Sequence, residues 1–447
     1  MTWIMLLCAA NASLGDEGSH PDTKQYEMLV RCSKREGADE WNQWREANPA
    51  EAINLQQADL TDMRFGGFDL RSSDLKGASL DKAQFIGANL RGANLQNTSL
   101  DETHFTRADF TDASLRDASG IGPHFEGADL TRADLQGTVL EPAYFDGALL
   151  SLSNLRKAQL KNARMSSVRL LGATLSFANL ECATLAGAEI TEADLAGSCL
   201  DGADMSYAAV TDVNMTEASC TTAQLTGARI IRCSLERASL GGSVLAQTLF
   251  VQTDLRGADF RMAMVDGTTC FLDCRFDGRS DFRGVGLGNV RMPERYKTYL
   301  EQNIRKLNWE DWYKTHPWQE VGVRSFWWIS DYGYSTWRIV WCFVFSAVVF
   351  AATYGIWGMF APPGLIQDQQ ELCHFTPAWR YYLVRILRPF YFSVVTMTTL
   401  GFGDIRANPK SVWGHIIVTS QVIWGYFLLG AIVTRLGILF TSGGPGL

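Results

Sequence analysis

The residues best suited to chemistry lie near the C-terminus, in a short segment rich in threonine and glycine. Residues 396–404 read T-M-T-T-L-G-F-G-D, with larger residues around Gly401 and Gly403. Because glycine adopts backbone torsions that are closed to other residues, successive carbonyl oxygens here can point toward one axis. Such oxygens can replace the hydration shell of a cation, and the Thr399 hydroxyl can add a ligand at the inner end. The segment is therefore a candidate cation-coordinating site.

Two apolar stretches flank this segment. Residues 339–360 and 414–433 contain no Asp, Glu, Lys or Arg, and at 1.5 Å per residue each can cross a hydrocarbon core of about 30 Å. Residues 388–404 between them are too short and too interrupted to cross, so we expect them to dip into the bilayer and return. Pro389 fits the first turn of a short helix that ends near Thr398. The negative end of that helix dipole would then favour a cation.

The segment Thr399 to Gly403 resembles the T-V-G-Y-G selectivity filter of potassium channels, and residues 394–399 extend the likeness through the pore helix. The resemblance implies that K⁺ binds at Thr399, Leu400, Gly401, Phe402 and Gly403, and that Thr396, Thr398 and Asp404 support the filter or its outer mouth. Leu400 and Phe402 depart from the usual Val and Tyr, and the second change removes a hydroxyl that could brace the filter. We expect the preference for K⁺ to survive. Because one chain supplies one filter strand, the resemblance also implies a homotetramer.

Gly425, in the second apolar stretch, stands where such channels often carry a hinge glycine. It is the candidate gating hinge, and close helix packing explains a glycine there equally well. The chain shows no helix of spaced arginines and no Gly-rich nucleotide motif. The sequence therefore does not identify a gating stimulus.

A five-residue period fills residues 55–270. Of the 44 positions whose number is a multiple of five, 41 carry Leu, Phe, Met, Ile or Val, and the exceptions are Gly120, Cys220 and Cys270. Two residues earlier in the unit, Ala occurs in 27 of the 44 cases. A step of five fits neither an α-helix nor a flat strand, since it moves the apolar residue off any common face. The chain must therefore turn once per unit, returning each apolar side chain and its small neighbour to one narrow interior.

The units A-N-L-R-G (88–92) and A-N-L-Q-N (93–97) resemble those of the pentapeptide-repeat family. The resemblance implies a right-handed quadrilateral β-helix with four units per coil, hence about eleven coils and a rod on the order of 50 Å long. Phe282, Leu287 and Met292 follow the period shifted by two residues. We therefore expect the coil to fray beyond Cys274.

The outward positions of the repeat carry no recurring acid pair, histidine cluster or phosphate loop, so we expect no enzyme and no cofactor other than K⁺ as the permeant ion. Residues 53–292 have 30 acids and 22 bases, which argues against binding nucleic acid. The ten cysteines form no C-x-x-C, so neither a zinc site nor a disulfide framework is indicated. We expect the recurring acids and amides to bond the backbone of the turns: Asp59, Asp74, Asn89, Asn94, Asp109 and Asp129.

The sequence thus divides into four parts. A leader and N-terminal cap (1–52) contains a short helix at 38–45 whose Trp41 and Trp44 can cover the end of the rod, and residues 1–12 read either as a signal peptide or as a disordered leader. The β-helix (53–292) is followed by an amphipathic connector or interfacial helix (293–338). An all-α membrane pore domain (339–440) has two transmembrane helices, with its re-entrant pore helix and filter at 389–404.

The leading hypothesis is a passive potassium-selective channel in a lipid membrane, with the β-helices as regulatory or assembly modules. Seven Lys or Arg in 293–338 against five between the spans favour a cytoplasmic N-terminal domain. The resemblance to bacterial channels with pentapeptide repeats implies a multi-pass protein of the cell (inner) membrane. Two alternatives stay open. One is a membrane-tethered scaffold whose acidic rod binds an unidentified protein or ligand, and the other is a weakly selective cation channel.

Overall fold

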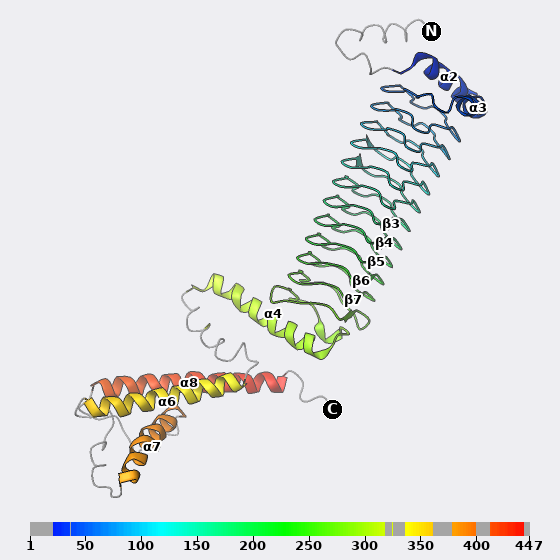
Figure 1. Ribbon diagram of the computed structural model, residues 1–447. Coiled ribbons are helices and arrows are strands. Elements are labelled where there is room, and N and C mark those ends of the chain that lie inside the picture. The colour runs from blue at the N-terminus through cyan, green and yellow to red at the C-terminus, as the bar shows by residue number, and fades with distance from the viewer. Residues whose placement is uncertain are drawn as a thin grey trace. The chain divides into compact units, whose positions relative to one another are not determined.

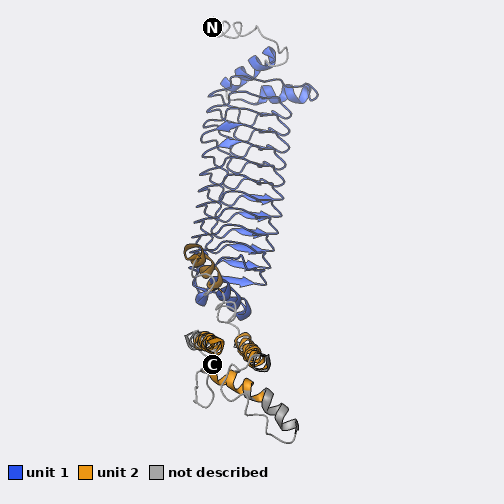
Figure 2. Ribbon diagram, turned by 90° about the vertical axis from the view of Figure 1, so that its left-hand side faces the viewer, with its two compact units in different colours: residues 1–304 blue, residues 305–447 orange. Residues whose placement is uncertain are grey.

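The computed structural model describes residues 21–35, 37–317, 324, 336–360, 378–398 and 412–441. The chain separates into two units, Met1–Ile304 and Arg305–Leu447 (Figure 2). The first unit contains the repeats and the second contains the apolar helices. Residues 1–12, for which a signal peptide or a disordered leader was predicted, lie outside the described residues.

The repeats form a rod because each five-residue unit turns a corner (Figure 1). The residue two places after the apolar one adopts a positive φ, as at Gly77 (67°) and Lys82 (60°). The next N–H then donates to the carbonyl of the apolar residue, as from Ala78 to Leu75 at 3.0 Å. Glycine takes this conformation without strain, which explains its frequency at the corners.

Backbone bridges join residues twenty apart in parallel, for example Asp74 with Asn94 and Asn94 with Ser114. Four units therefore make one coil, and the predicted quadrilateral β-helix is confirmed. Where pairing is most regular it forms a two-stranded and a six-stranded parallel sheet. The strands are β1 (Ser119–Gly120), β2 (Val139–Leu140), β3 (Arg169–Leu171), β4 (Glu189–Thr191), β5 (Ala209–Thr211), β6 (Arg229–Ile231), β7 (Leu249–Val251) and β8 (Cys270–Leu272).

The rod interior is filled as the pattern predicts. The central apolar residue and the alanine two places before it are both buried, as at Leu90 and Ala88. Phenylalanines in consecutive coils stack with ring centroids 4.8 to 5.2 Å apart. These are Phe65, Phe85, Phe105, Phe125 and Phe145. Aromatic pairs at such distances add to the free energy of burial.

The three exceptions to the apolar period have different physical reasons. Gly120 sits so close to the previous coil that a Cβ would lie 2.7 Å from the Leu100 carbonyl carbon. Cys220 is buried as a small apolar side chain. Cys270 is only half-buried because the register shifts by one residue there, and Phe271 takes the interior position.

The coils do not fray near the C-terminal end, so that expectation is wrong. Bridges continue as far as Arg291. The spacing between bridged residues grows to 21 between Asp254 and Arg275, and to 22 between Asp259 and Asp281. The shifted period therefore reflects wider coils and not an open end.

Two wide Asp-Gly turns absorb the additional residues. Asp266 Oδ1 accepts the N–H groups of Thr268 and Thr269, both at 2.9 Å, and Asp277 Oδ1 makes the corresponding bonds at 3.0 and 3.1 Å. The hydroxyl of Ser280 then reaches inward to a carbonyl of the previous coil at 2.9 Å. In each turn the aspartate side chain bonds the N–H groups of the turn itself, so these groups need no partner in another coil and the stack of coils continues.

Two helices cover the N-terminal end of the rod: α2 (Thr23–Lys34), which was not predicted, and α3 (Asp39–Ala47). Trp41 in α3 is fully buried, and its indole N–H donates to the Asp69 carbonyl at 2.8 Å. Trp44 packs beside it with ring centroids 5.1 Å apart. The predicted aromatic cap is confirmed.

The other end of the rod leads through the short helix η1 (Leu287–Asn289) into α4 (Glu294–Thr315). Leu300 of α4 is fully buried, and the Asn303 amide donates to the Ser280 carbonyl at 2.7 Å. The predicted amphipathic helix is therefore present, and its first turns close the last coil. Its predicted interfacial role stays a prediction.

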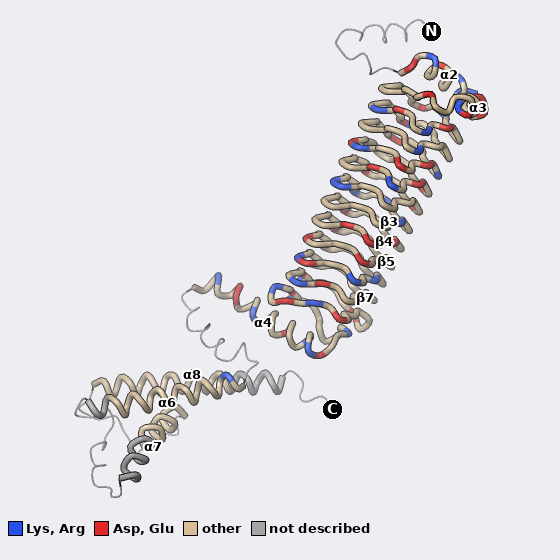
Figure 3. Tube along the Cα trace, viewed as in Figure 1, with Lys and Arg blue, Asp and Glu red and all other residues tan. Residues whose placement is uncertain are grey.

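The described residues of the second unit include the end of α4 and the helices α6 (Thr336–Phe360), α7 (Ala378–Met397) and α8 (Val412–Thr441). Within α6 and α8, residues Trp337–Ile356 and Val412–Val433 are long and apolar enough to cross a membrane. Charged residues spread along the rod but are scarce in these two helices (Figure 3). Both helices pack on α7, which is the element that carries the candidate site.

The helix α7 differs from the prediction at its start. Pro389 was expected in the first turn, but the helix begins at Ala378 and Pro389 lies inside it. Proline in a helix interior removes one backbone hydrogen bond, and membrane helices tolerate it where neighbouring groups satisfy the backbone. The helix end agrees with the prediction, since α7 stops at Met397.

Candidate functional site

The described part of the candidate site is the helix end that precedes the predicted filter in the chain. Thr396, Thr398 and Gly425 are described, whereas Thr399, Leu400, Gly401, Phe402, Gly403 and Asp404 lie outside the described residues. The K⁺-binding roles of these residues stay predictions.

Thr398 closes the C-terminal end of α7. Its N–H donates to the Val394 carbonyl at 2.9 Å, and its hydroxyl donates to the carbonyls of Val394 and Val395 at 3.0 and 3.2 Å. Such back-bonding satisfies carbonyls that a helix end leaves open. Thr396, two residues earlier, is half-buried. The segment 399–403 therefore follows a helix whose last turn is held by its own side chain.

The helix α8 passes the end of α7 at Gly425. A Cβ on Gly425 would overlap the Met397 carbonyl oxygen and lie 2.8 Å from the Met397 Cα. Glycine lets two helix backbones approach this closely, as small residues do at membrane helix interfaces. The packing explanation for Gly425 is thus supported, and its role as a gating hinge stays a prediction.

A buried polar cluster beside the end of α7 was missed by the sequence reasoning. The Tyr354 hydroxyl of α6 donates to Gln421 Oε1 of α8. Gln421 Nε2 in turn donates to the carbonyl and the hydroxyl of Ser393 in α7, at 2.9 and 2.6 Å. One signal for it exists in the sequence: a glutamine inside an apolar span is costly unless it is bonded. Its partners lie 28 and 67 residues away, which no local pattern reveals.

On the rod, the predicted turn chemistry is confirmed. Each of the six recurring acids and amides accepts the N–H of the residue two places on, at 2.8 to 3.2 Å. These are Asp59, Asp74, Asn89, Asn94, Asp109 and Asp129. Their oxygens are therefore used to shape the corners of the coil.

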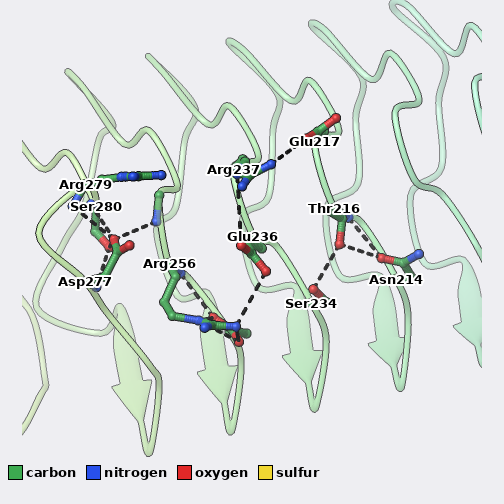
Figure 4. Close-up of polar contacts among 12 residues, drawn as sticks. Asn214, Thr216, Glu217, Ser234, Glu236, Arg237, Arg256, Asp277, Arg279 and Ser280 are labelled. Atoms are coloured by element: carbon green, nitrogen blue, oxygen red, sulfur yellow. Dashed lines mark hydrogen bonds and ion pairs between the residues drawn. The ribbon is translucent and has the colours of Figure 1, made fainter.

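Ion pairs run from coil to coil near the C-terminal end of the rod (Figure 4). Between coils, Arg237 contacts Glu217 at 3.1 Å and Arg256 contacts Glu236 at 3.5 Å. Within one coil, Arg256 also contacts Asp254 at 2.7 Å. The hydrogen bond from Arg256 holds the pKa of Asp254 below its usual range. Water screens exposed pairs of this kind, so each contributes little to stability. Among the residues that the structure describes, no group of three or more His, Cys, Asp or Glu is arranged to hold a metal.

Comparison with known protein families identifies both parts of the chain. A family of pentapeptide repeats matches with eight copies, over residues 53–92, 88–119, 133–170, 169–206, 203–242 and 233–269. An ion channel family matches residues 372–442, which contain α7, α8 and the predicted filter. Neither family is enzymatic. No curated protein matches the chain significantly.

Several solved structures are similar to the repeat region. HetL, a pentapeptide repeat protein involved in heterocyst differentiation regulation from the cyanobacterium Nostoc, is 26% identical over 55% of this chain and 95% of its own, with a TM-score of 0.26. A pentapeptide repeat protein from the Arabidopsis thaliana thylakoid lumen is 23% identical over 26% of this chain and 70% of its own, with a TM-score of 0.20. QnrB1, a plasmid-mediated fluoroquinolone resistance protein, is 16% identical over 46% and 96%, with a TM-score of 0.29.

These scores are too low to compare the structures in detail, so the fold assignment rests on the repeat itself. The coils of four units, with bridges from Asn54 to Arg291, agree with the family match, whose copies lie within residues 53–269. The two apolar helices and α7 lie in or next to the region that matches an ion channel. The chain therefore joins a β-helical domain of pentapeptide repeats to a C-terminal ion channel domain of a membrane protein.

Proposed function

We propose that the chain is the subunit of a potassium-selective channel. The observation that carries the proposal is the segment T-L-G-F-G at 399–403, which begins two residues after α7 ends and precedes α8. A lone G-F-G is common in loops, but here it follows a helix inside a region that matches an ion channel. That context favours a filter over an ordinary loop.

The proposed mechanism is passive conduction. Carbonyl oxygens of residues 399–403 replace the water around K⁺, and the negative end of α7 lowers the energy of a cation nearby. One chain supplies one strand of oxygens, so four copies surround one axis. No covalent step is involved, and the ion moves down its own gradient.

The rod is assigned a regulatory or assembly role on the cytoplasmic side of the cell membrane. Its net negative charge would suit a protein or ligand that carries positive charge, and the sequence shows no run of regularly spaced arginines of the kind found in voltage sensors. The charge bias across the spans supports the cytoplasmic placement.

The test is ion flux through the purified full-length protein in planar bilayers. With K⁺ on one side and Na⁺ on the other, the reversal potential should lie close to that of K⁺. Gly401→Ala should abolish the current, because alanine disfavours the torsions that turn the filter carbonyls inward. Gly355→Ala is the matched control, because a Cβ there would meet no described atom within 4 Å apart from the backbone of its own helix.

The alternatives give different results. A wild-type protein that passes no K⁺ current would refute the proposal and leave the membrane-tethered scaffold. Equal currents of K⁺ and Na⁺ would identify a weakly selective cation channel instead.

A further inference from the structure

Three polar side chains from three helices are bonded to one another in the interior of the second unit. Tyr354 of α6, Ser393 of α7 and Gln421 of α8 are all fully buried. Burying polar groups in the apolar interior of a membrane domain costs free energy unless they are hydrogen-bonded, and such groups often have a functional role. We call these three residues the pore-helix clamp.

The hydrogen bonds of the clamp determine the orientation of the glutamine amide. The Ser393 carbonyl can only accept, so the Gln421 atom 2.9 Å from it must be the NH₂ group. The second hydrogen of this group is directed to the Ser393 hydroxyl at 2.6 Å. Gln421 Oε1 then accepts from the Tyr354 hydroxyl. Removing one member would leave a buried partner without its bond.

The clamp acts on the last turn of α7. Ser393 lies one turn before Met397, where α7 ends, and Gln421 lies one turn before Gly425 on α8. The two contacts, Gln421 to Ser393 and Gly425 to Met397, thus lie on one face of each helix. The Gln421–Ser393 contact is a directional hydrogen bond, and the close approach of Gly425 to Met397 leaves no space for α7 to shift along α8. Together they fix the end of α7 in height and rotation.

We propose that Gln421, Tyr354 and Ser393 are positioning residues for ion conduction. This inference rests on the proposed function, because the segment that α7 presents is the predicted filter. The clamp holds the end of α7 against α6 and α8, so that the carbonyls of residues 399–403 keep the spacing that K⁺ requires. Its loss gives a protein that assembles but conducts less or selects less sharply.

The electrical test compares three clamp variants with a matched control in the full-length protein. Tyr354→Phe, Gln421→Leu and Ser393→Ala each remove clamp hydrogen bonds. Ser346→Ala is the control, because it removes a part-buried hydrogen bond between α6 and α8, from the Trp424 indole at 2.9 Å, that involves no residue of α7. Clamp variants should lower the single-channel conductance or the K⁺ to Na⁺ permeability ratio by about threefold to tenfold. Both quantities should stay within about twofold of wild type in the control, because it loses one weak hydrogen bond that does not involve α7.

A second measurement is independent of current. Amide hydrogen exchange of peptides covering residues 390–398 should be about threefold to tenfold faster in the clamp variants than in Ser346→Ala. Tyr354→Phe removes a single oxygen and serves where Gln421→Leu does not assemble. If the wild type carries no current, the proposed function fails, while exchange still tests whether the clamp holds α7. Unchanged exchange, or unchanged conductance and selectivity in assembled clamp variants, would overturn the inference.

Discussion

At the scale of single residues, Gly120 shows how little space separates two coils of the rod. It occupies an interior position where 41 of 44 repeats carry a large apolar side chain. The previous coil fills that space instead, through the backbone and Cβ of Leu100. A sequence pattern marks Gly120 only as an irregularity, whereas the structure gives a steric reason for it.

Gly120→Ala should therefore destabilise the rod. The added methyl would lie 2.7 Å from the Leu100 carbonyl carbon, and overpacking of this kind costs about 1–3 kcal/mol. Thermal unfolding followed by circular dichroism should show a lower midpoint. Gly241→Ala is the control, since its Cβ would meet the nearest atom at an ordinary 3.6 Å. Equal midpoints for the two variants would contradict the steric explanation.

At the scale of elements, helix α3 protects the first coil of the rod. An uncovered coil would present unpaired backbone groups to the coils of other molecules. Trp41 fills the opening with its ring and bonds the Asp69 carbonyl through its indole N–H. The aromatic pair was visible in the sequence. The helix α2 was missed, although Tyr26, Leu29 and Cys32 recur at helical spacing and pack on the core.

Trp41→Ala should weaken the cap by about 3–5 kcal/mol, the usual cost of deleting a large buried ring. We expect a lower unfolding midpoint and a tendency of the rods to associate end to end, seen by light scattering. Trp41→Phe keeps most of the ring and loses the hydrogen bond, so it should cost about 0.5–1.5 kcal/mol. A Trp41→Ala protein that unfolds like the wild type would show that α3 does not support the coil.

The helices of the second unit show where local sequence reasoning ends. Apolar spans and the end of α7 at Met397 were predictable, since uncharged stretches and turn residues are local signals. The early start of α7 was not, because Pro389 read as a helix start and is tolerated here inside a helix. The link from Gln421 to Ser393 and Tyr354 depends on three helices meeting. Such contacts are absent from any local window of sequence.

At the scale of the whole molecule, the rod was predictable in outline because its five-residue period is strict and continues over many repeats. The position of each buried leucine follows from counting in fives, and the use of Asp59 and Asn89 in turns follows from their place in the unit. Counting failed where Asp266 and Asp277 widen the turns. For the candidate site, Thr398 and Gly425 are placed, while Thr399 to Asp404 stay predictions.

The cysteines report the integrity of the rod. Burial raises the pKa of Cys220 to about 12 and that of Cys274 to about 12, whereas Cys182 is exposed. Because the thiolate is the reactive form, a raised pKa and burial both slow alkylation. Iodoacetamide at pH 8 should label Cys182 and leave Cys220 and Cys274 unlabelled until denaturant is added, as read by peptide mass spectrometry. Rapid labelling of Cys220 in the native protein would be inconsistent with a packed interior.

The twenty-residue bridge spacing also sets a rule for changes in length. Inserting twenty residues would add one complete coil and leave unchanged the direction in which the chain leaves the rod to enter α4. Inserting five residues would add only a quarter of a coil, yet the chain would then leave the rod from the next of its four sides. Length and heading are therefore coupled, and natural or engineered variants that preserve the heading should differ in length by whole multiples of twenty.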